Sequence, residues 1–326
     1  MPRIIITALV GAVLSGGIGY LLLPVLRALK AGQSIREIGP TWHNNKAGTP
    51  MMGGLMFIFA AILCLLGNLA ACVMESYTVF LVIGLALCFG LVGFLDDFFK
   101  IKFKRNLGLT SIQKALLQMA VSAIFLYILY KLNALSTEFF IPFFKIQTPK
   151  LHLFAYLFIA MFIMVGCVNA VNLTDGVDGL CATVTLPVMI FFAAIACYKQ
   201  QYDIAILPAA LAGGLVAYLF FNWHPAKVFM GDTGSLFLGG VTCALAFALD
   251  IPLVLVLVGF VYIVETMSVI LQVGYFKLTK GKRLFKMSPI HHHFEMSGWK
   301  EEKICIVFGL VSAVMCVIAW FSVVGF

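Results

Sequence analysis

The chain has 326 residues, of which 62% are hydrophobic and 11% are charged, and its formal net charge is +8. A soluble domain carries about 45–50% apolar and about 25% charged residues, so this composition excludes an ordinary soluble protein and requires lipid around most of the chain. The apolar runs are long and continuous rather than short and alternating, which excludes an outer-membrane β-barrel. The sequence therefore predicts an all-α, polytopic integral membrane protein.

Apolar runs bounded by polar clusters predict about ten transmembrane helices in a single membrane-embedded domain over residues 1–326. The first run is too long for a signal-peptide core and lacks an evident cleavage site, so we interpret it as a retained span. The ninth is longer than a perpendicular crossing needs and contains Glu265, so we expect it to tilt or break. In chain order the predicted spans are 4–29, 52–74, 78–99, 112–131, 152–171, 179–198, 203–221, 233–249, 252–276 and 304–325.

Ten spans place both termini on the same side of the membrane. The loops and span ends of one side then hold seventeen of the 22 Lys and Arg residues, and those of the other side hold five. The positive-inside rule makes the richer side cytoplasmic, so both termini are expected to be extracytoplasmic. The loop 132–150 faces outward, where its aromatic stretch is expected to form a short hairpin or helix. Anionic lipid headgroups and anionic substrates are both plausible partners for the basic inner face.

The third span ends in the motif Asp96-Asp97-Phe-Phe-Lys100. On a helix, residues three and four apart share a side, so Lys100 can face both carboxylates. Adjacent carboxylates suit a general base or a pair of Mg²⁺ ligands, and the lysine can neutralise a phosphate. A helix-end ion pair at the membrane boundary is an equally simple interpretation of this motif alone.

The fifth span leads into NAVNLTDGVDGL, in which polar residues recur every three positions. Their side chains lie on roughly one stripe of a helix, and the amide and carboxylate oxygens are ligands that Mg²⁺ prefers. Gly176 and Gly179 permit close approach of a ligand to the backbone. A loop with ordinary capping residues is the alternative. The recurring residues are Asn169, Asn172, Asp175 and Asp178.

The segment NWHPAKVFMGDTGS, from Asn222 to Ser235, precedes the eighth span. Asp232 can be a plain helix cap, but a helix that begins near Gly231 also presents free backbone N–H groups to an anion. Phe229 can stack on a base or anchor the segment at the interface. Further along, His291, His292 and His293 lie in the large loop before the last span, where imidazoles can contact phosphate or sugar.

Five aspartates from three loops fall on the side that is expected to be cytoplasmic. Neither solubility nor orientation requires acidic residues at span ends on a basic face. Their convergence therefore predicts a shared cation. The nine cysteines lie in or beside apolar runs, without a CxxC pair, so they indicate neither a zinc site nor a disulfide framework. The five aspartates are Asp96, Asp97, Asp175, Asp178 and Asp232.

These motifs, in this order, resemble the polyprenyl-phosphate N-acetylhexosamine-1-phosphate transferase superfamily over nearly the whole chain. HNNKAGTPMMGG, LDDFFK, NLTDGVDGL, FMGDTGS and PIHHHFE carry the resemblance. The forms PIHHHFE and KAGTP favour the peptidoglycan branch over relatives that use UDP-N-acetylglucosamine. Met51 is a departure, since the family pattern GTPTMGG has Thr at that position.

The resemblance implies transfer of phospho-MurNAc-pentapeptide from UDP-MurNAc-pentapeptide to undecaprenyl phosphate, giving lipid I and UMP at the cytoplasmic face of a bacterial inner membrane. It implies Mg²⁺ as cofactor, with Asp232 and Asn172 as ligands, and no nucleic-acid partner; a homodimer is left open. The implied catalytic residues are Asp96, Asp97, Asp232, His291, His292 and His293. The implied substrate-binding residues are Lys46, Lys100, Lys114, Asn169, Asn172, Asp175, Asp178, Asn222, Phe229 and Gly231.

For the reaction step, we hypothesise direct attack by the lipid phosphate, with Asp97 orienting it or accepting a proton; a covalent aspartyl intermediate is the competing path. From another class, a secondary transporter would place its polar groups near the bilayer midplane. Here they lie at span ends, with Glu265 the interior exception. A membrane scaffold would not need Asp, Asn, Lys and His on one face. Within the enzyme interpretation, a UDP-N-acetylglucosamine-1-phosphate transferase is the alternative.

Overall fold

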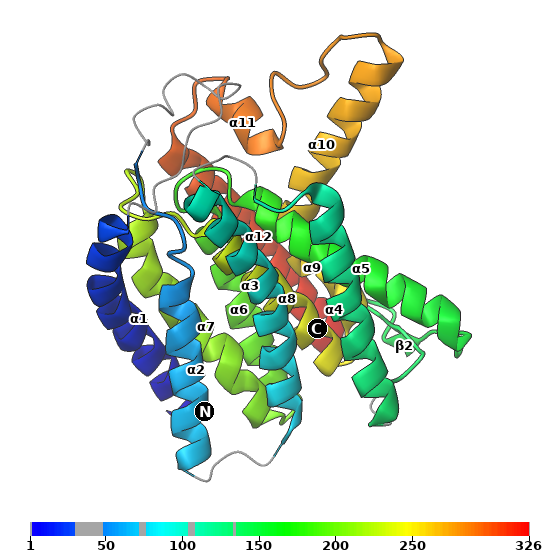
Figure 1. Ribbon diagram of the computed structural model, residues 1–326. Helices are drawn as coiled ribbons and strands as arrows, with labels where there is room; N and C mark the ends of the chain where they lie inside the picture. Colours follow the sequence, from blue (N-terminus) through cyan, green and yellow to red (C-terminus); the bar gives the residue numbers. More distant parts are fainter. Residues whose placement is uncertain (1, 30–47, 72–75, 104–107, 133–134, 326) are drawn as a thin grey trace.

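A computed structural model describes residues 2–29, 48–71, 76–103, 108–132 and 135–325. In this part of the chain, long helices account for nearly all of the secondary structure (Figure 1). Nine of the described helices are long and apolar enough to cross a membrane, and α2 is a shorter apolar helix. The helices are α1 (Pro2–Ala28), α2 (Leu55–Ala70), α3 (Thr78–Phe103), α4 (Ser111–Lys131), α5 (Leu153–Thr174), α6 (Leu180–Tyr198), α7 (Tyr202–Asn222), α8 (Gly231–Ala248), α9 (Leu255–Val258), α10 (Phe260–Leu278), α11 (Ile290–Glu295) and α12 (Glu301–Val324).

Each of the ten predicted apolar runs coincides with helix, which confirms the all-α class. The second predicted span is the least accurate, because α2 has 16 residues, fewer than the roughly 20 that a perpendicular crossing needs. The ninth run breaks, as its length predicted. A short 3₁₀ turn, η2 (Pro252–Val254), and α9 come before Gly259, and α10 starts afresh at Phe260.

Helix α8 lies at the centre of the bundle and is almost wholly buried (Figure 1). It packs most extensively against α3 and α5. The approach of α3 is close because Gly93 has no side chain: a Cβ atom there would lie 2.1 Å from the backbone oxygen of Asp232. The contact brings the end of α3 beside the start of α8.

The two termini lie at the end of the bundle opposite to the start of α8. Arg3 forms an ion pair with Asp203 at the start of α7, and the Lys145 ammonium donates to the backbone oxygen of Val324 near the end of α12. Lys145 belongs to a small antiparallel hairpin of β1 (Phe140–Ile141) and β2 (Ile146–Gln147). The hairpin prediction for this loop is thereby confirmed.

Helix α10 leans away from the other helices, and the chain returns from its end to α11 (Figure 1). The return is fixed by Gln272, whose side-chain oxygen accepts hydrogen bonds from the backbone N–H groups of Leu284 and Phe285. Helix α11 then contacts both α10 and α12. The histidine segment is therefore held against the bundle.

Candidate active site

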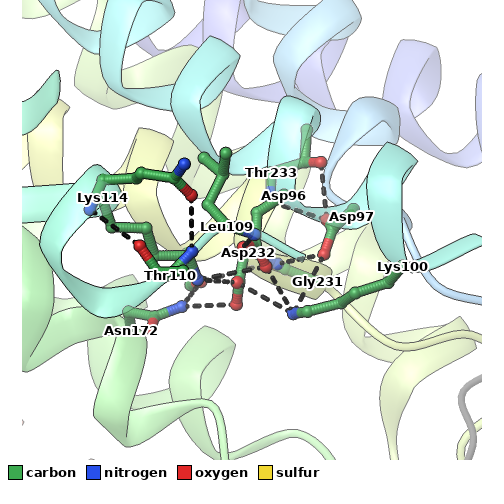
Figure 2. A network of polar contacts seen from close by, with 12 residues as sticks. Asp96, Asp97, Lys100, Leu109, Thr110, Lys114, Asn172, Gly231, Asp232 and Thr233 are labelled. Atoms are coloured by element: carbon green, nitrogen blue, oxygen red, sulfur yellow. Dashed lines mark hydrogen bonds and ion pairs between the residues drawn. The ribbon is translucent and has the colours of Figure 1, made fainter. Parts of the chain in front are cut away.

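Three carboxylates meet where α3 ends and α8 begins (Figure 2). One oxygen of each of Asp96, Asp97 and Asp232 lies within 4.8 Å of the others. Asp96 and Asp97 are 1% and 0% exposed, so their charges lie almost entirely out of water. Such a cluster is stable only if cations or hydrogen-bond donors compensate it.

Two lysines provide most of that compensation. The Lys100 ammonium lies 2.6 Å from Asp96 Oδ2 and 3.0 Å from Asp232 Oδ2. The Lys114 ammonium, from the first turn of α4, lies 3.1 Å from Asp96 Oδ2 and also pairs with Asp232 Oδ2. Three carboxylates against two ammonium groups leave a formal charge of −1. The cluster can therefore accept further positive charge.

Asp97 is bound to the N-terminus of α8. Its carboxylate accepts hydrogen bonds from the backbone N–H groups of Asp232, at 3.2 Å, and Thr233, at 2.9 Å, and from the Thr233 hydroxyl, at 2.7 Å. These N–H groups have no partner within their own helix, so a carboxylate stabilises them. Gly231 has φ +74°, and a Cβ there would lie 2.6 Å from Asp97 Oδ2. Glycine is therefore needed where the chain enters α8.

Asn172 joins the cluster from α5. Its Nδ2 donates to Asp232 Oδ1, at 2.9 Å, and to the Ser235 hydroxyl, at 2.7 Å. Both contacts use Nδ2, so the carbonyl oxygen is the atom that would ligate a cation. Asn169 is engaged elsewhere, since its amide pairs with that of Gln118 in α4. This pair holds α4 beside α5 and lies next to the charged cluster rather than in it.

Asp175 follows α5 in the turn that leads to α6 and is partly exposed. The surrounding protein nevertheless desolvates its carboxyl group and raises the pKa to about 8, with further contributions from Asp232, Asp97 and Asp178. Desolvation is the larger cause of this shift, and the negative charges of Asp97 and Asp232 add to it. The electrostatics therefore couple Asp175 to two of the three central carboxylates.

Asp178 lies at the far side of this turn in a second group. Its Oδ2 contacts His224 Nδ1 at 2.9 Å, and its backbone N–H donates to Glu301 at the start of α12. A cavity of about 590 Å³ opens beside these three residues and is also lined by Trp299 and Lys300. The cavity therefore offers polar and charged side chains to a ligand, and the residues that line it are distinct from those of the central cluster.

Asn222 and Phe229 shape the segment between α7 and α8. Asn222 is buried; its amide accepts from the Gly179 N–H and donates to the Val228 oxygen. Phe229 is partly exposed, and its backbone pairs with Pro50 and Gly53. Asn222 thus ties the two glycine-containing turns together, and Phe229 ties the second of them to the start of α2.

The three histidines differ in their surroundings. His291 is 0% exposed and its Nδ1 lies 3.0 Å from Glu265 Oε2. His292 pairs with Glu295 one turn along α11. His293 Nδ1 accepts the backbone N–H of Lys286. The structure thus separates three consecutive residues that the sequence could only treat as one motif.

The remaining residues of the site include some that the sequence predicted and some that it did not. Lys46 lies outside the described residues, and Met51, at the position where the family pattern has Thr, is buried. Thr233 donates its hydroxyl to Asp97, and the Ser235 hydroxyl accepts from Asn172; a helix N-terminus alone predicts neither contact. Sequence reasoning missed Gln118, His224 and Glu301. The one available signal was a polar residue inside an apolar span for Gln118 and a span-end position for the other two.

Comparison with known proteins gives consistent matches, and those to individual proteins extend over nearly the whole chain. A family model described as Glycosyl transferase family 4 matches residues 78–250. The phospho-N-acetylmuramoyl-pentapeptide-transferase of Clostridium perfringens (strain SM101 / Type A) is 48% identical over 324 residues, which cover 98% of this chain and 97% of that protein. The protein of the same name from Clostridium acetobutylicum is 44% identical, and the match covers 99% of this chain and 100% of that protein. The one from Listeria monocytogenes serotype 4b (strain CLIP80459) is 47% identical, and the match covers 91% of this chain and 92% of that protein.

Proposed function

The chain belongs to the phospho-N-acetylmuramoyl-pentapeptide-transferases of glycosyl transferase family 4, and on this premise we propose that it makes lipid I. It transfers phospho-MurNAc-pentapeptide from its UDP carrier to undecaprenyl phosphate and releases UMP. The observation that carries the proposal is the cluster of Asp96, Asp97 and Asp232 with two lysines at one end of the helical bundle. Its position suits a reaction at a membrane surface, and its net negative charge favours a divalent cation that would neutralise two reacting anions.

The reaction needs little covalent help from the protein. An oxygen of the lipid phosphate attacks the phosphorus that carries the sugar, and the bond to UMP breaks. One phosphoanhydride is lost as another forms, so the step is near thermoneutral and reversible. Positioning and charge stabilisation dominate such transfers. Lys100, which pairs with three carboxylates, and Lys114, which pairs with two, are placed to move between those carboxylates and the incoming phosphates.

A Mg²⁺ site at Asp232 and Asn172 fits the residues that are present. The available donors are carboxylate and amide oxygens, which are hard ligands. The two lysines leave the three carboxylates with a net charge of −1, which favours a divalent cation. When bound, Mg²⁺ would neutralise the phosphates of the donor and polarise the phosphorus under attack.

The remaining residues then take distinct roles. Asp97 fixes the N-terminus of α8 and hence the position of Asp232. Asp175, Asp178 and Phe229, with Lys46, form the nucleoside side of the site, and the histidines of α11 close its rim. Asn222, Asn169 and Gly231 hold the segments that carry these groups.

The basic end of the bundle that carries the cluster is the cytoplasmic one in this proposal. The UDP-linked donor is soluble and made inside the cell, while the acceptor is confined to the membrane, so their phosphates can meet only at the inner surface. The excess of Lys and Arg on this side supports the orientation. Both termini are then extracytoplasmic, because they lie at the opposite end.

Release of UMP tests the proposal. Purified protein is supplied with undecaprenyl phosphate, Mg²⁺ and either UDP-MurNAc-pentapeptide or UDP-N-acetylglucosamine, with a chelator in a parallel reaction. UMP release is expected with the muramoyl donor, none with the acetylglucosamine donor, and none after chelation. Release with the acetylglucosamine donor alone would assign the chain to the other substrate branch.

Isotope exchange separates direct attack from a covalent aspartyl intermediate. A covalent path would exchange labelled UMP into the UDP donor without the lipid acceptor, because UMP leaves in the first step. Direct attack permits exchange only when the acceptor is present. We expect exchange to require undecaprenyl phosphate, and exchange in its absence would establish the two-step path.

A further inference from the structure

Glu265 is an ionisable side chain in the first half of the apolar helix α10, and it is 0% exposed. Placing a carboxyl group in such surroundings is costly, so a residue of this kind usually has a specific partner or function. None of the contacts described for the acidic cluster involves Glu265. Its presence therefore requires a separate explanation.

The partner of Glu265 is His291. Glu265 Oε2 and His291 Nδ1 are 3.0 Å apart, and both side chains are 0% exposed. Glu265 belongs to α10 and His291 to α11, so the contact joins two elements that are separated by a long loop. An imidazole whose Nδ1 is bound by a carboxylate is fixed in orientation, because the ring can no longer rotate freely.

The other nitrogen of His291 faces the central turn. Nε2 is buried, and among the residues that the structure describes it has no hydrogen-bond partner. A Cβ atom at Gly176 would lie 2.1 Å from it, so the imidazole rests directly on the backbone between Asp175 and Val177. The same turn follows Asn172, which contacts Asp232. Nε2 is therefore a buried polar atom directed to the turn beside the cluster.

We propose that Glu265 is a positioning residue for the transfer reaction, which holds the imidazole of His291 so that its Nε2 serves the donor substrate. This inference rests on the proposed function and gives His291 a specific reactive atom. Since Nδ1 is bound by Glu265, Nε2 is the nitrogen that contacts the diphosphate or the sugar. Glu265 itself touches no substrate and acts only through His291.

The arrangement follows a principle seen in other enzymes, where a carboxylate behind an imidazole sets which nitrogen is available to the substrate. Removing such a carboxylate reduces turnover without removing the binding surface. A structural role predicts something different: loss of Glu265 would destabilise the helices whether or not His291 is present. The two possibilities are therefore separable by a double-mutant cycle.

The experiment compares wild type, Glu265→Gln, His291→Ala and the double variant by UMP release, with radiolabelled donor and enough enzyme to follow slow turnover. Glu265→Gln is expected to lower kcat about 30-fold and to change KM for the UDP donor by less than about threefold. In the His291→Ala background, the same substitution is expected to change kcat by less than about twofold.

Ser268→Ala is the matched control. Ser268 is buried on the same helix and its hydroxyl donates to the backbone oxygen of Glu265, so it reports the cost of perturbing α10 alone. It is expected to keep kcat within about twofold of wild type. Nitrogen NMR of histidine-labelled protein provides a second measurement, in which Glu265→Gln, but not Ser268→Ala, shifts the Nδ1 signal of a single histidine.

An equal loss of kcat from Glu265→Gln with and without His291 would overturn the proposal, as would an unchanged histidine spectrum. Unchanged turnover of Glu265→Gln would do the same. These results are distinct from failure of the proposed function, which would appear as absence of UMP release by the wild-type protein. If the wild-type protein releases UMP but the effects of Glu265→Gln and His291→Ala on kcat are additive, only the proposed role of Glu265 is wrong.

Discussion

Both carboxylate oxygens of Asp97 are occupied by donors from the first turn of α8, and Oδ2 accepts both an N–H and a hydroxyl hydrogen bond from Thr233. Oδ2 therefore has less remaining capacity than Oδ1 to accept a proton from substrate. These contacts give Asp97 a further role besides the two hypothesised for it, which are to orient the lipid phosphate or to accept a proton: it orients the first turn of α8. Through the helix it holds, Asp97 determines where the carboxylate of Asp232 lies.

Asp97→Asn is expected to lower kcat by more than about 100-fold even with saturating Mg²⁺. The amide directs its own donor at N–H or O–H groups, and each buried donor left unpaired costs about 1–3 kcal/mol, which displaces the start of α8. Thr233→Ser keeps the hydroxyl and should remain within about threefold of wild type. Steady-state UMP release measures both variants, and near-normal turnover of Asp97→Asn would exclude either role for this carboxylate.

Gly176 is the residue on which the His291 imidazole rests. Gly176→Ala would bring a methyl group to 2.1 Å from Nε2, so the ring must move and kcat should fall at least about tenfold. Gly166→Ala in α5 is the matched control, because a Cβ there meets no atom within 4 Å. Parallel UMP-release assays and thermal unfolding curves test the pair. Equal activity of the two variants would show that the position of the imidazole does not matter.

The high pKa of Asp175, about 8, predicts a pH dependence of cation binding. At pH 7 the carboxyl is mainly protonated; a divalent cation at the cluster favours the ionised form and so expels the proton. Affinity for Mg²⁺ should therefore rise between pH 6 and about 8 and level off above. Mg²⁺ titrations of UMP release at several pH values measure this. Asp175→Asn should flatten the curve, and an unchanged slope would show that another group binds the proton.

At the scale of elements, hydropathy predicted the long helices well because lipid requires long apolar runs that satisfy their own backbone hydrogen bonds. The break in the ninth run was also predictable from its length and from Glu265. The parity of the spans predicted that five aspartates would converge; Asp96, Asp97 and Asp232 do meet, whereas Asp178 belongs to a second group with His224 and Glu301. The helices and their arrangement can thus be predicted from the length of the apolar runs and from their order along the chain.

Side-chain partners were not predictable in the same way. Asn169 and Gln118 pair through their amides, and Asp178 pairs with His224 and Glu301. Each partner comes from a different helix or loop, and the pairing depends on rotations and translations of a few ångströms that hydropathy does not encode. For the same reason, the sequence left the role of Glu265 open until α11 was placed against α10.

The contact between α3 and α8 gives a prediction at this scale. Gly93→Ala would place a methyl group 2.1 Å from the backbone oxygen of Asp232, so the two helices must separate at the active site. Overpacking of this kind costs about 1–3 kcal/mol. We expect a lower unfolding temperature and slower UMP release.

The control for that substitution is Gly84→Ala in the same helix, where a Cβ meets no atom within 4 Å. It should leave stability and activity unchanged or slightly raise stability, since alanine favours helix over glycine by about 1 kcal/mol. Similar unfolding temperatures for the two variants would indicate that α3 and α8 can separate without cost.

For the whole molecule, the positions of the charged groups and of the two termini predict its orientation in the membrane. The hairpin and both termini lie at one end, while the acidic cluster and the basic loop after α10 belong to the other. A reaction that joins a soluble nucleotide donor to a lipid phosphate needs the second end to face the cytoplasm. The topology therefore has a functional consequence that can be measured without any assay of activity.

Labelling of introduced cysteines by a membrane-impermeant maleimide measures the orientation of the protein in the membrane. Phe144→Cys lies in the hairpin loop, where the native side chain is 75% exposed, and Lys282→Cys lies in the exposed basic loop. In intact spheroplasts, Phe144→Cys should be labelled and Lys282→Cys should not, and permeabilisation should expose Lys282→Cys. Cys88, the exposed native thiol among those described, lies within α3 and should be poorly labelled, because lipid excludes a charged reagent. The reverse pattern would put the acidic cluster outside the cell, where the UDP-linked donor is absent, and the proposed reaction could not occur there.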